Sequence, residues 1–307
     1  MVKTVTPIVK PFVKWAGGKR QLLHEIRQKY PTDLGSKINK YAEPFVGGGA
    51  VLFDILSRYD LKEVYISDIN KELIHAYITI RDSVDELIDI LRLMENDYLS
   101  ASEEERKTIY SEMRNKFNLL KKNDVNSTTL AALFIFLNKT CFNGLYRVNA
   151  NGGFNVPHGK YTNPRICDEN NLRAVSKKLR IVNIVCSDYK NVMDFIDSST
   201  FAYFDPPYRP LTTTANFTSY TKDGFCDKAQ ADLATFINAV SVKGAYIAAS
   251  NSDPKNVDEQ DNFFDILYAT HKISRIQASR AINCNGAKRG KIKELLITNT
   301  EKEDGNA

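Results

Sequence analysis

Short apolar runs alternate with helical patterns along much of the chain. Apolar runs bounded by Gly, Pro, Asp or Asn are typical of strands buried on both faces. They are found at Tyr41–Phe45, Val64–Ser67, Ile181–Cys186, Phe201–Phe204, Ala245–Ala249, Phe263–Tyr268 and Leu295–Thr298. Apolar residues at helical spacing predict helices at Lys19–Lys29, Glu72–Arg81, Val84–Leu93, Asn170–Leu179 and Asp227–Val242. This alternation predicts a doubly wound α/β fold, in which helices cover both faces of a mostly parallel sheet.

The alternation fails between about residues 70 and 165. Helical patterns run together there, at Asp82–Leu99, Ser102–Lys122 and Thr128–Asn138. In the Gly- and Asn-rich stretch that follows, Tyr146–Val148 and Phe154–Val156 flank Asn149–Gly153, a pattern typical of a β-hairpin. We therefore expect a main domain formed by residues 1–70 and 165–300, an inserted helical and hairpin lobe at 71–164, and a polar tail at 301–307.

Composition and charge exclude several classes of protein. The chain has 307 residues, 43% hydrophobic and 26% charged, so a packed core is expected. A net charge of +5 permits nucleic-acid binding without requiring it. Basic residues concentrate at 1–40, 139–165 and 271–294, and these stretches either converge into one patch or form separate solvated surfaces. No apolar run reaches the roughly 20 residues of a membrane helix, and no signal-peptide core is visible, so we expect no membrane association.

Cysteine usage indicates a reducing compartment. The five cysteines are widely spaced and include no CxxC pair. This pattern argues against a disulfide framework or a structural zinc site, so we expect a cytoplasmic protein without a metal.

Two motifs in the first quarter of the chain indicate a nucleoside cofactor. The sequence EPFVGGGA at Glu43–Ala50 follows an apolar strand, and its glycines permit a sharp turn and close approach of backbone to a ligand. It lacks the GK[ST] of a phosphate-binding loop, which argues against NTP hydrolysis. Asp68, at the end of the second strand, is placed either to bind ribose hydroxyls or to cap the following helix. NAD, FAD and S-adenosylmethionine are all compatible with these two motifs.

A third motif narrows the chemistry. Asp205-Pro206-Pro207-Tyr208 follows a strand, and its prolines stiffen a loop at the strand's carboxyl end, where such sheets bind their ligands. The Asp205 carboxylate and the Pro206 carbonyl are hydrogen-bond acceptors beside the aromatic ring of Tyr208. This combination suits a planar ligand with an exocyclic amino group. The alternative interpretation is that Asp-Pro-Pro forms only a turn and binds no ligand.

Taken together, these motifs resemble the Dam-type DNA adenine-N6 methyltransferases of the D12 class, with the alpha-group motif order. The resemblance extends from Phe12 to about Thr300 and is closest to the enzymes of GATC-specific restriction-modification systems. Its motifs, in order, are KWAGGK (14–19), EPFVGGGA (43–50), SDIN (67–70), NGLYRVN (143–149), FNVPHGKY (154–161), FDPPYRPL (204–211), FTSYT (217–221) and NGAKRGKIKELLITN (285–299). It implies a seven-stranded S-adenosylmethionine-dependent methyltransferase sheet with an inserted DNA-recognition lobe.

The resemblance also implies roles for individual residues. The cofactor S-adenosylmethionine would be bound by Trp15, Lys19, Phe45, Gly47, Gly49, Asp68, Asp188 and Asp205. The residues implied for catalysis are Asp205, Pro206 and Tyr208, with Phe217 and Tyr220 as further candidates for the pocket wall. The residues implied for DNA recognition are Lys14, Phe142, Asn143, Leu145 and Arg147, among which Arg147 would contact a guanine.

The resulting hypothesis is methyl transfer from S-adenosylmethionine to a flipped-out adenine in double-stranded DNA, within GATC. No metal is expected, and a cognate restriction endonuclease would act on the same sites without direct contact. One alternative is an amino methyltransferase acting on single-stranded DNA or RNA. Others are an inactive DNA-binding relative, against which the intact DPPY motif argues, and an NAD-linked dehydrogenase, which would not need that motif.

Overall fold

The structure is a computed structural model that describes residues 9–209, 225–279 and 291–299. The chain divides into two compact units. The first unit comprises Met1–Gly18, Gly47–Arg58 and Asp68–Cys186, and the second comprises Lys19–Val46, Tyr59–Ser67 and Ser187–Ala307. Each unit is described below by itself.

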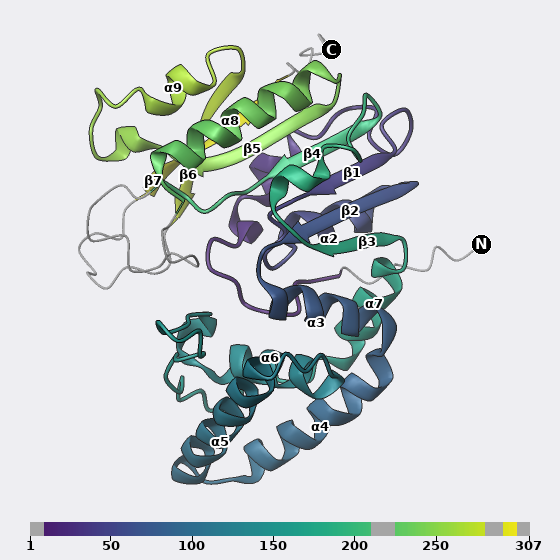
Figure 1. The fold of residues 1–307 in the computed structure, drawn as a ribbon, viewed down its shortest axis with the longest axis vertical. Helices are drawn as coiled ribbons and strands as arrows, with labels where there is room; N and C mark the ends of the chain where they lie inside the picture. The colour runs from purple at the N-terminus through teal and green to yellow at the C-terminus, as the bar shows by residue number, and fades with distance from the viewer. Residues whose placement is uncertain (1–8, 210–224, 280–290, 300–307) are drawn as a thin grey trace. The chain divides into compact units, whose positions relative to one another are not determined.

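The described strands form a seven-stranded sheet in the order β3-β2-β1-β4-β5-β7-β6 (Figure 1). The strands are β1 (Lys40–Glu43), β2 (Glu63–Asp68), β3 (Val182–Cys186), β4 (Thr200–Phe204), β5 (Tyr246–Ser252), β6 (Lys272–Ser279) and β7 (Lys291–Thr298). β1 pairs in parallel with both β2 and β4, and β4 pairs in parallel with β5. β7 runs antiparallel to both of its neighbours, β5 and β6. The prediction of a mostly parallel α/β sheet is therefore confirmed.

The order of strands places two loops side by side. Every residue of β4 is buried, as the near-continuous apolar sequence of a central strand requires. The chain order reverses between β1 and β4, which are parallel neighbours, so their carboxyl ends meet at the same edge of the sheet. The loops that leave this edge begin at Pro44 and Asp205. Open α/β sheets bind ligands at such a switch point.

The described residues include nine α-helices, most of which are labelled in Figure 1. They are α1 (Leu23–Arg27), α2 (Ala50–Arg58), α3 (Lys71–Asp82), α4 (Val84–Ser100), α5 (Glu103–Lys122), α6 (Thr128–Thr140), α7 (Glu169–Leu179), α8 (Asp227–Val242) and α9 (Phe263–Leu267). In the first unit, α3, α4 and α5 all pack against α6, which is apolar on nearly all sides. A helix buried all round forms the core of its unit. In the second unit, α8 packs against β5.

Three sequence predictions need correction. The run at Phe263–Tyr268 was expected to be a strand but forms the short helix α9, in which Ile266 is 73% exposed. A short apolar run does not distinguish strand from helix by periodicity. Strand β6 was not predicted, because it is an edge strand that carries Lys272 and Arg275 instead of a continuous apolar run. The helix expected at Lys19–Lys29 is broken into a 3-10 turn, η1 (Lys19–Gln21), and α1.

The predicted hairpin is confirmed. Val148 and Phe154 form an isolated antiparallel bridge, and the Asn149 N–H donates to the Gly153 carbonyl across 2.8 Å. Among the described residues, no helix has the length and apolar character needed to cross a membrane.

Candidate active site

A glycine turn in the first unit packs tightly against the single tryptophan. Gly47 has a φ of +48°, and a Cβ added there would lie 2.8 Å from Cδ1 of Trp15. A side chain at this position is therefore excluded by both backbone strain and contact. The Tyr77 hydroxyl donates a hydrogen bond to the Gly47 carbonyl at 3.1 Å, which holds the turn in place. Gly49 also has a positive φ, of +73°.

Asp68 joins this turn to the start of α3. Its Oδ2 accepts a hydrogen bond from the Gly47 N–H at 3.1 Å, and its Oδ1 accepts one from the Asn70 N–H at 2.9 Å. The N-cap of α3 is Asn70, whose side chain accepts from the Leu73 N–H, so Asp68 is not the helix cap. Burial raises the pKa of Asp68, and the backbone N–H groups of Asn70, Gly47 and Ile69 oppose that rise.

In the DPPY loop of the second unit, one carboxylate oxygen of Asp205 is bound by two other side chains. Oδ1 of Asp205 lies 2.7 Å from Nζ of Lys19 and accepts a hydrogen bond from the Ser250 hydroxyl, also at 2.7 Å. The Tyr203 hydroxyl lies 3.0 Å from Ser250 Oγ. Because serine has one hydroxyl hydrogen, already given to Asp205, Tyr203 is the donor in that bond. The resulting chain of donors runs from Tyr203 through Ser250 to Asp205.

Two acceptors of this loop remain open. Within the described ranges, no residue donates a hydrogen bond to Oδ2 of Asp205 or to the Pro206 carbonyl oxygen. The next carbonyl, that of Pro207, is held by the Gln230 amide at 3.0 Å, so the loop is anchored immediately beyond the open acceptors.

The tyrosine of the motif is fixed at both its ring and its hydroxyl. The Tyr208 hydroxyl donates to Oε2 of Glu294 on β7 at 2.6 Å, and Nζ of Lys19 lies 4.5 Å from the centre of the Tyr208 ring. Burial, followed by the charges of Asp205 and Glu294, raises the pKa of Tyr208 well above its ordinary value. The phenol therefore stays neutral and acts as a flat, oriented surface.

Phe45 and Asp188 come together elsewhere in the second unit. Phe45, in the loop after β1, stacks on Tyr189 with ring centres 5.4 Å apart. Tyr189 begins the 3-10 helix η3 (Tyr189–Val192), whose N-cap is Asp188. Asp188 is exposed and accepts from the Lys190 N–H at 3.0 Å.

In the first unit, Asn138 joins Lys14 to the NGLYR segment. Its Oδ1 accepts from the Lys14 N–H at 2.8 Å, while its amide donates to the carbonyls of Lys14 and Gly144, at 2.7 and 3.0 Å. Asn143 and Gly144 have φ values of +54° and +63°, and a Cβ on Gly144 would lie 2.5 Å from Cβ of Lys14. The Asn-Gly pair is therefore required by the backbone.

The same segment exposes several of the residues predicted to recognise DNA. Phe142 is 51% exposed, Asn143 and Arg147 are exposed, and Leu145 is half-buried. Nε of Arg147 donates to Oδ1 of Asn155 at 2.8 Å, which orients the guanidinium along the hairpin.

Comparison with known proteins decides the family. The family model for D12 class N6 adenine-specific DNA methyltransferases matches residues 15–282. The chain belongs to this family. It is 50% identical over 293 residues to the type II methyltransferase M.MjaIII of Methanocaldococcus jannaschii, with 95% of this chain and 99% of that protein covered.

Two further relatives of this D12-class enzyme have similar coverage. It is 34% identical to the type II methyltransferase M1.LlaDCHI of Lactococcus lactis subsp. cremoris, with 95% of each chain covered. It is 33% identical to the DNA adenine methylase of Escherichia coli K12, with 94% of each chain covered. The chain is therefore an adenine-specific DNA methyltransferase, and a methyltransferase of this family implies S-adenosylmethionine as the methyl donor and DNA as the substrate.

Within each unit of the D12-class enzyme, predicted residues that are distant in sequence come together. The first unit assembles Trp15 with Gly47 and Asp68, and the second assembles Lys19 with Asp205 and Tyr208. Phe217 and Tyr220 lie outside the described residues. So do residues 280–290, which belong to the basic stretch at 271–294. Among the described residues, no group of three or more His, Cys, Asp or Glu side chains is arranged to hold a metal ion.

Sequence reasoning missed the residues that support these groups. They are Asn138, Asn155, Ser250 and Glu294. Asn155 and Glu294 lie inside the FNVPHGKY and KIKELLITN motifs, so the motif itself was the available signal. Asn138 and Ser250 lie at the ends of apolar segments and carry no local signal for their contacts.

Proposed function

We propose that this enzyme methylates N6 of an adenine that has been flipped out of duplex DNA, within the sequence GATC. The observation that carries the proposal is the pair of open acceptors, Asp205 Oδ2 and the Pro206 carbonyl, beside the fixed ring of Tyr208. An adenine amino group has two N–H bonds, and this loop offers one acceptor for each.

The chain's residues favour the reaction by holding the amino group. The N6 lone pair is normally delocalised into the purine ring, which makes the amine a poor nucleophile. Hydrogen bonds from its two N–H groups to Asp205 and Pro206 favour a pyramidal nitrogen with an available lone pair. As positive charge develops on N6, the fixed carboxylate of Asp205 stabilises it.

Base flipping follows from the position of the amino group. An adenine inside a duplex is unreachable, and extruding it costs a few kcal/mol. Stacking of the base on Tyr208 returns about 1–3 kcal/mol. Because Glu294 fixes the Tyr208 hydroxyl, this ring is already oriented before the base arrives.

The residues of the glycine turn fit a nucleoside cofactor. The glycine turn places backbone without side chains next to Trp15, and the Asp68 carboxylate at its end carries hydrogen-bond acceptors that suit ribose hydroxyls. We assign the cofactor contacts to Trp15, Lys19, Phe45, Gly47, Gly49, Asp68, Asp188 and Asp205. When bound, S-adenosylmethionine supplies an electrophilic methyl group on a sulfonium.

We assign DNA recognition to the lobe at 71–164, between catalytic segments at 1–70 and 165–300. Arg147 would make bidentate contact with a guanine, worth about 1–3 kcal/mol of discrimination. Phe142, Asn143 and Leu145 would enter the opened duplex, and Lys14 would contact DNA near the target. The names of the type II relatives support a cognate restriction endonuclease acting on the same sites, and a DNA substrate supports a cytoplasmic location.

The test combines a restriction assay with mass spectrometry. Plasmid DNA is treated with enzyme and S-adenosylmethionine, then digested with one nuclease blocked by GATC adenine methylation and one that cuts GATC regardless. We expect resistance to the first nuclease, cleavage by the second, and N6-methyladenine among the digested nucleosides. N6-methyladenine without resistance would refute GATC, whereas its absence from duplex but presence in single-stranded DNA or RNA would favour the alternative substrate.

A further inference from the structure

One tyrosine in the first unit connects the recognition segment to the supports of the glycine turn. The Tyr146 hydroxyl donates to Oε2 of Glu72 at 2.8 Å and accepts from Nζ of Lys121 at 2.8 Å. Lys121 also lies 2.9 Å from Oε1 of Glu72, which closes a triangle of three side chains. Glu72 lies in the first turn of α3 and Lys121 in the last turn of α5, so the triangle joins three elements at one point. We call Tyr146, Glu72 and Lys121 the Tyr146 triangle.

The triangle is partly buried, which strengthens its charge-assisted bonds. The side chains of Glu72 and Lys121 are 12% and 22% exposed. Burial, and then the charge of Glu72, raises the pKa of Tyr146 far above its ordinary value, so the hydroxyl keeps its proton. A charge-assisted bond that is partly shielded from water contributes more than a neutral surface bond.

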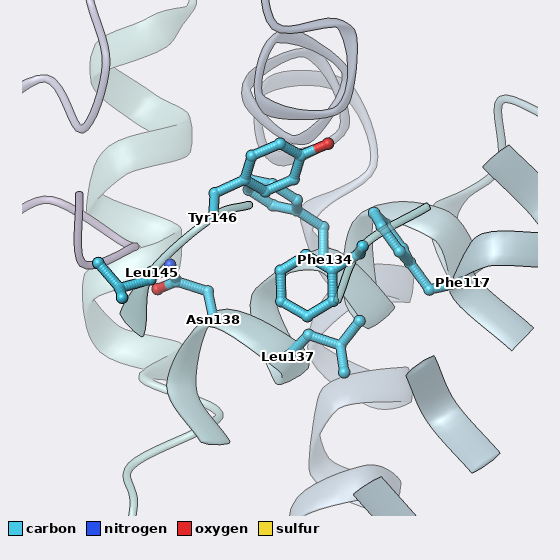
Figure 2. A pocket seen from close by; sticks show the side chains of 7 residues that line it. Phe117, Phe134, Leu137, Asn138, Leu145 and Tyr146 are labelled. Atoms are coloured by element: carbon cyan, nitrogen blue, oxygen red, sulfur yellow. The ribbon is translucent and has the colours of Figure 1, made fainter. Parts of the chain in front are cut away.

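The ring of Tyr146 packs against the tryptophan of the glycine turn. The rings of Tyr146 and Trp15 stack with centres 5.9 Å apart and planes 27° apart. Figure 2 shows Tyr146 beside Phe134, with Leu145 and Asn138 lining the same small pocket. The indole of Trp15 in turn covers Gly47. Movement of the Tyr146 ring therefore changes the packing that closes the glycine turn.

Both ends of Tyr146 consequently touch supports of the proposed cofactor site. Its ring touches Trp15, and its hydroxyl binds Glu72, two residues beyond the Asn70 cap that Asp68 holds. Its sequence neighbour is Arg147, whose guanidinium rests on Asn155. Because Arg147 and Tyr146 share a peptide bond, a change in the backbone at Arg147 on binding a guanine would also move Tyr146.

We propose that Tyr146 is a positioning residue that couples DNA recognition by residues 142–158 to cofactor binding at the glycine turn. This inference rests on the proposed roles of Arg147, Trp15 and Asp68. Coupling between two sites is reciprocal, so bound DNA raises cofactor affinity by the same factor as bound cofactor raises DNA affinity. Typical couplings are about 5- to 150-fold.

The experiment measures that factor in both directions with the full chain. Calorimetry gives the Kd of sinefungin, an unreactive S-adenosylmethionine analogue, with and without a saturating duplex. Fluorescence anisotropy gives the Kd of the labelled duplex with and without sinefungin. The fluorescence of Trp15, the single tryptophan, gives an independent readout at the glycine turn.

The test variant is Tyr146→Phe, which keeps the ring and removes the hydroxyl from the triangle. We expect a coupling factor above 5 in the wild type and below 2 in Tyr146→Phe, in both directions. The matched control is Tyr110→Phe, because the Tyr110 hydroxyl donates to the Val156 carbonyl at 2.6 Å and holds the same hairpin without touching the triangle. Tyr110→Phe should keep the wild-type factor, and thermal melting establishes that each variant is folded.

Three outcomes would overturn the inference. The first is a coupling factor of 1 in the wild type, and the second is a coupling factor in Tyr146→Phe equal to that of the wild type. The third is an equal loss of coupling in Tyr146→Phe and Tyr110→Phe. Should Tyr146→Phe fail to fold, Glu72→Gln takes its place with the same expected loss. The duplex carries the sequence in which sequencing finds the methylated adenine, so a failure of GATC is scored separately from a failure of coupling.

Discussion

The chain of donors from Tyr203 through Ser250 to Asp205 makes Ser250→Ala an informative perturbation. The substitution removes one of two donors to Asp205 Oδ1 and leaves Lys19 in place. A hydrogen bond to a charged acceptor is worth about 1.5–3 kcal/mol. If that energy holds the carboxylate in its reactive orientation, the methyl-transfer rate falls by about 10- to 100-fold.

The same variant has a second, separable effect on stability. Ser250→Ala leaves the fully buried Tyr203 hydroxyl without its acceptor, which costs about 1–3 kcal/mol. Tyr203→Phe removes that orphaned hydroxyl, while Ser250 still donates to Asp205. Tyr203→Phe alone should therefore retain activity, and the double variant should be less destabilised than the sum of the single variants.

Single-turnover methyl transfer and urea unfolding measure these two effects. We expect Ser250→Ala to lose rate at saturating DNA with little change in DNA affinity, and the double variant to show a favourable coupling of about 1 kcal/mol in unfolding. A wild-type rate in Ser250→Ala, or strict additivity of the two substitutions, would refute the reasoning.

Three other substitutions test separate contacts. Glu294→Leu should lower the single-turnover rate by about 10-fold because it removes the acceptor of the Tyr208 hydroxyl. Glu294→Gln keeps an acceptor and should retain most of the wild-type rate. Equal rates in the two variants would contradict this role of Glu294. Gly144→Ala should weaken DNA binding and lower the melting temperature, because its left-handed backbone lies against Lys14; anisotropy and thermal melting measure both. Burial lowers the pKa of Lys139 to about 8, so its charge destabilises the fold fully below pH 8 and progressively less as the pH rises toward the ordinary lysine value of 10.5. Lys139→Met should therefore be more stable than the wild type at pH 7, and urea unfolding at pH 7 and 9.5 should show the difference narrowing.

The fold was largely accessible from the apolar pattern. Every residue of β4 is buried, and the sequence from Phe201 to Phe204 is apolar without interruption. In β1 the same burial extends over Tyr41, Ala42 and Glu43. The pattern failed at the edge of the sheet. β6 is an edge strand that carries Lys272 and Arg275 and has no continuous apolar run. The helix α9 buries only Phe264. The spacing of apolar residues reflects which side chains are buried. Short segments that bury few side chains therefore cannot be assigned to helix or strand from this spacing.

The motifs of the candidate site could be predicted from the sequence, but the side-chain contacts that hold them could not. The DPPY and Gly-rich sequences name the groups that meet ligands, because special backbone conformations demand glycine and proline. The residues that orient those groups reach them across the fold: Ser250 is 45 residues from Asp205, and Glu294 is 86 residues from Tyr208. Lys19 was expected to contact the cofactor, and its ammonium lies on Asp205, a pairing that only the folded chain brings about. Its cofactor contact stays a prediction.

The central claim is that Asp205 holds the reacting amino group, and the single-turnover rate of Asp205→Ala tests it most directly. The rate is measured at saturating duplex and S-adenosylmethionine, with both dissociation constants determined on the same preparation. We expect the rate constant to fall by about 10³-fold or more while both affinities change only a few-fold, since the lost contact acts on the transition state. A rate constant within 10-fold of the wild type would contradict the account.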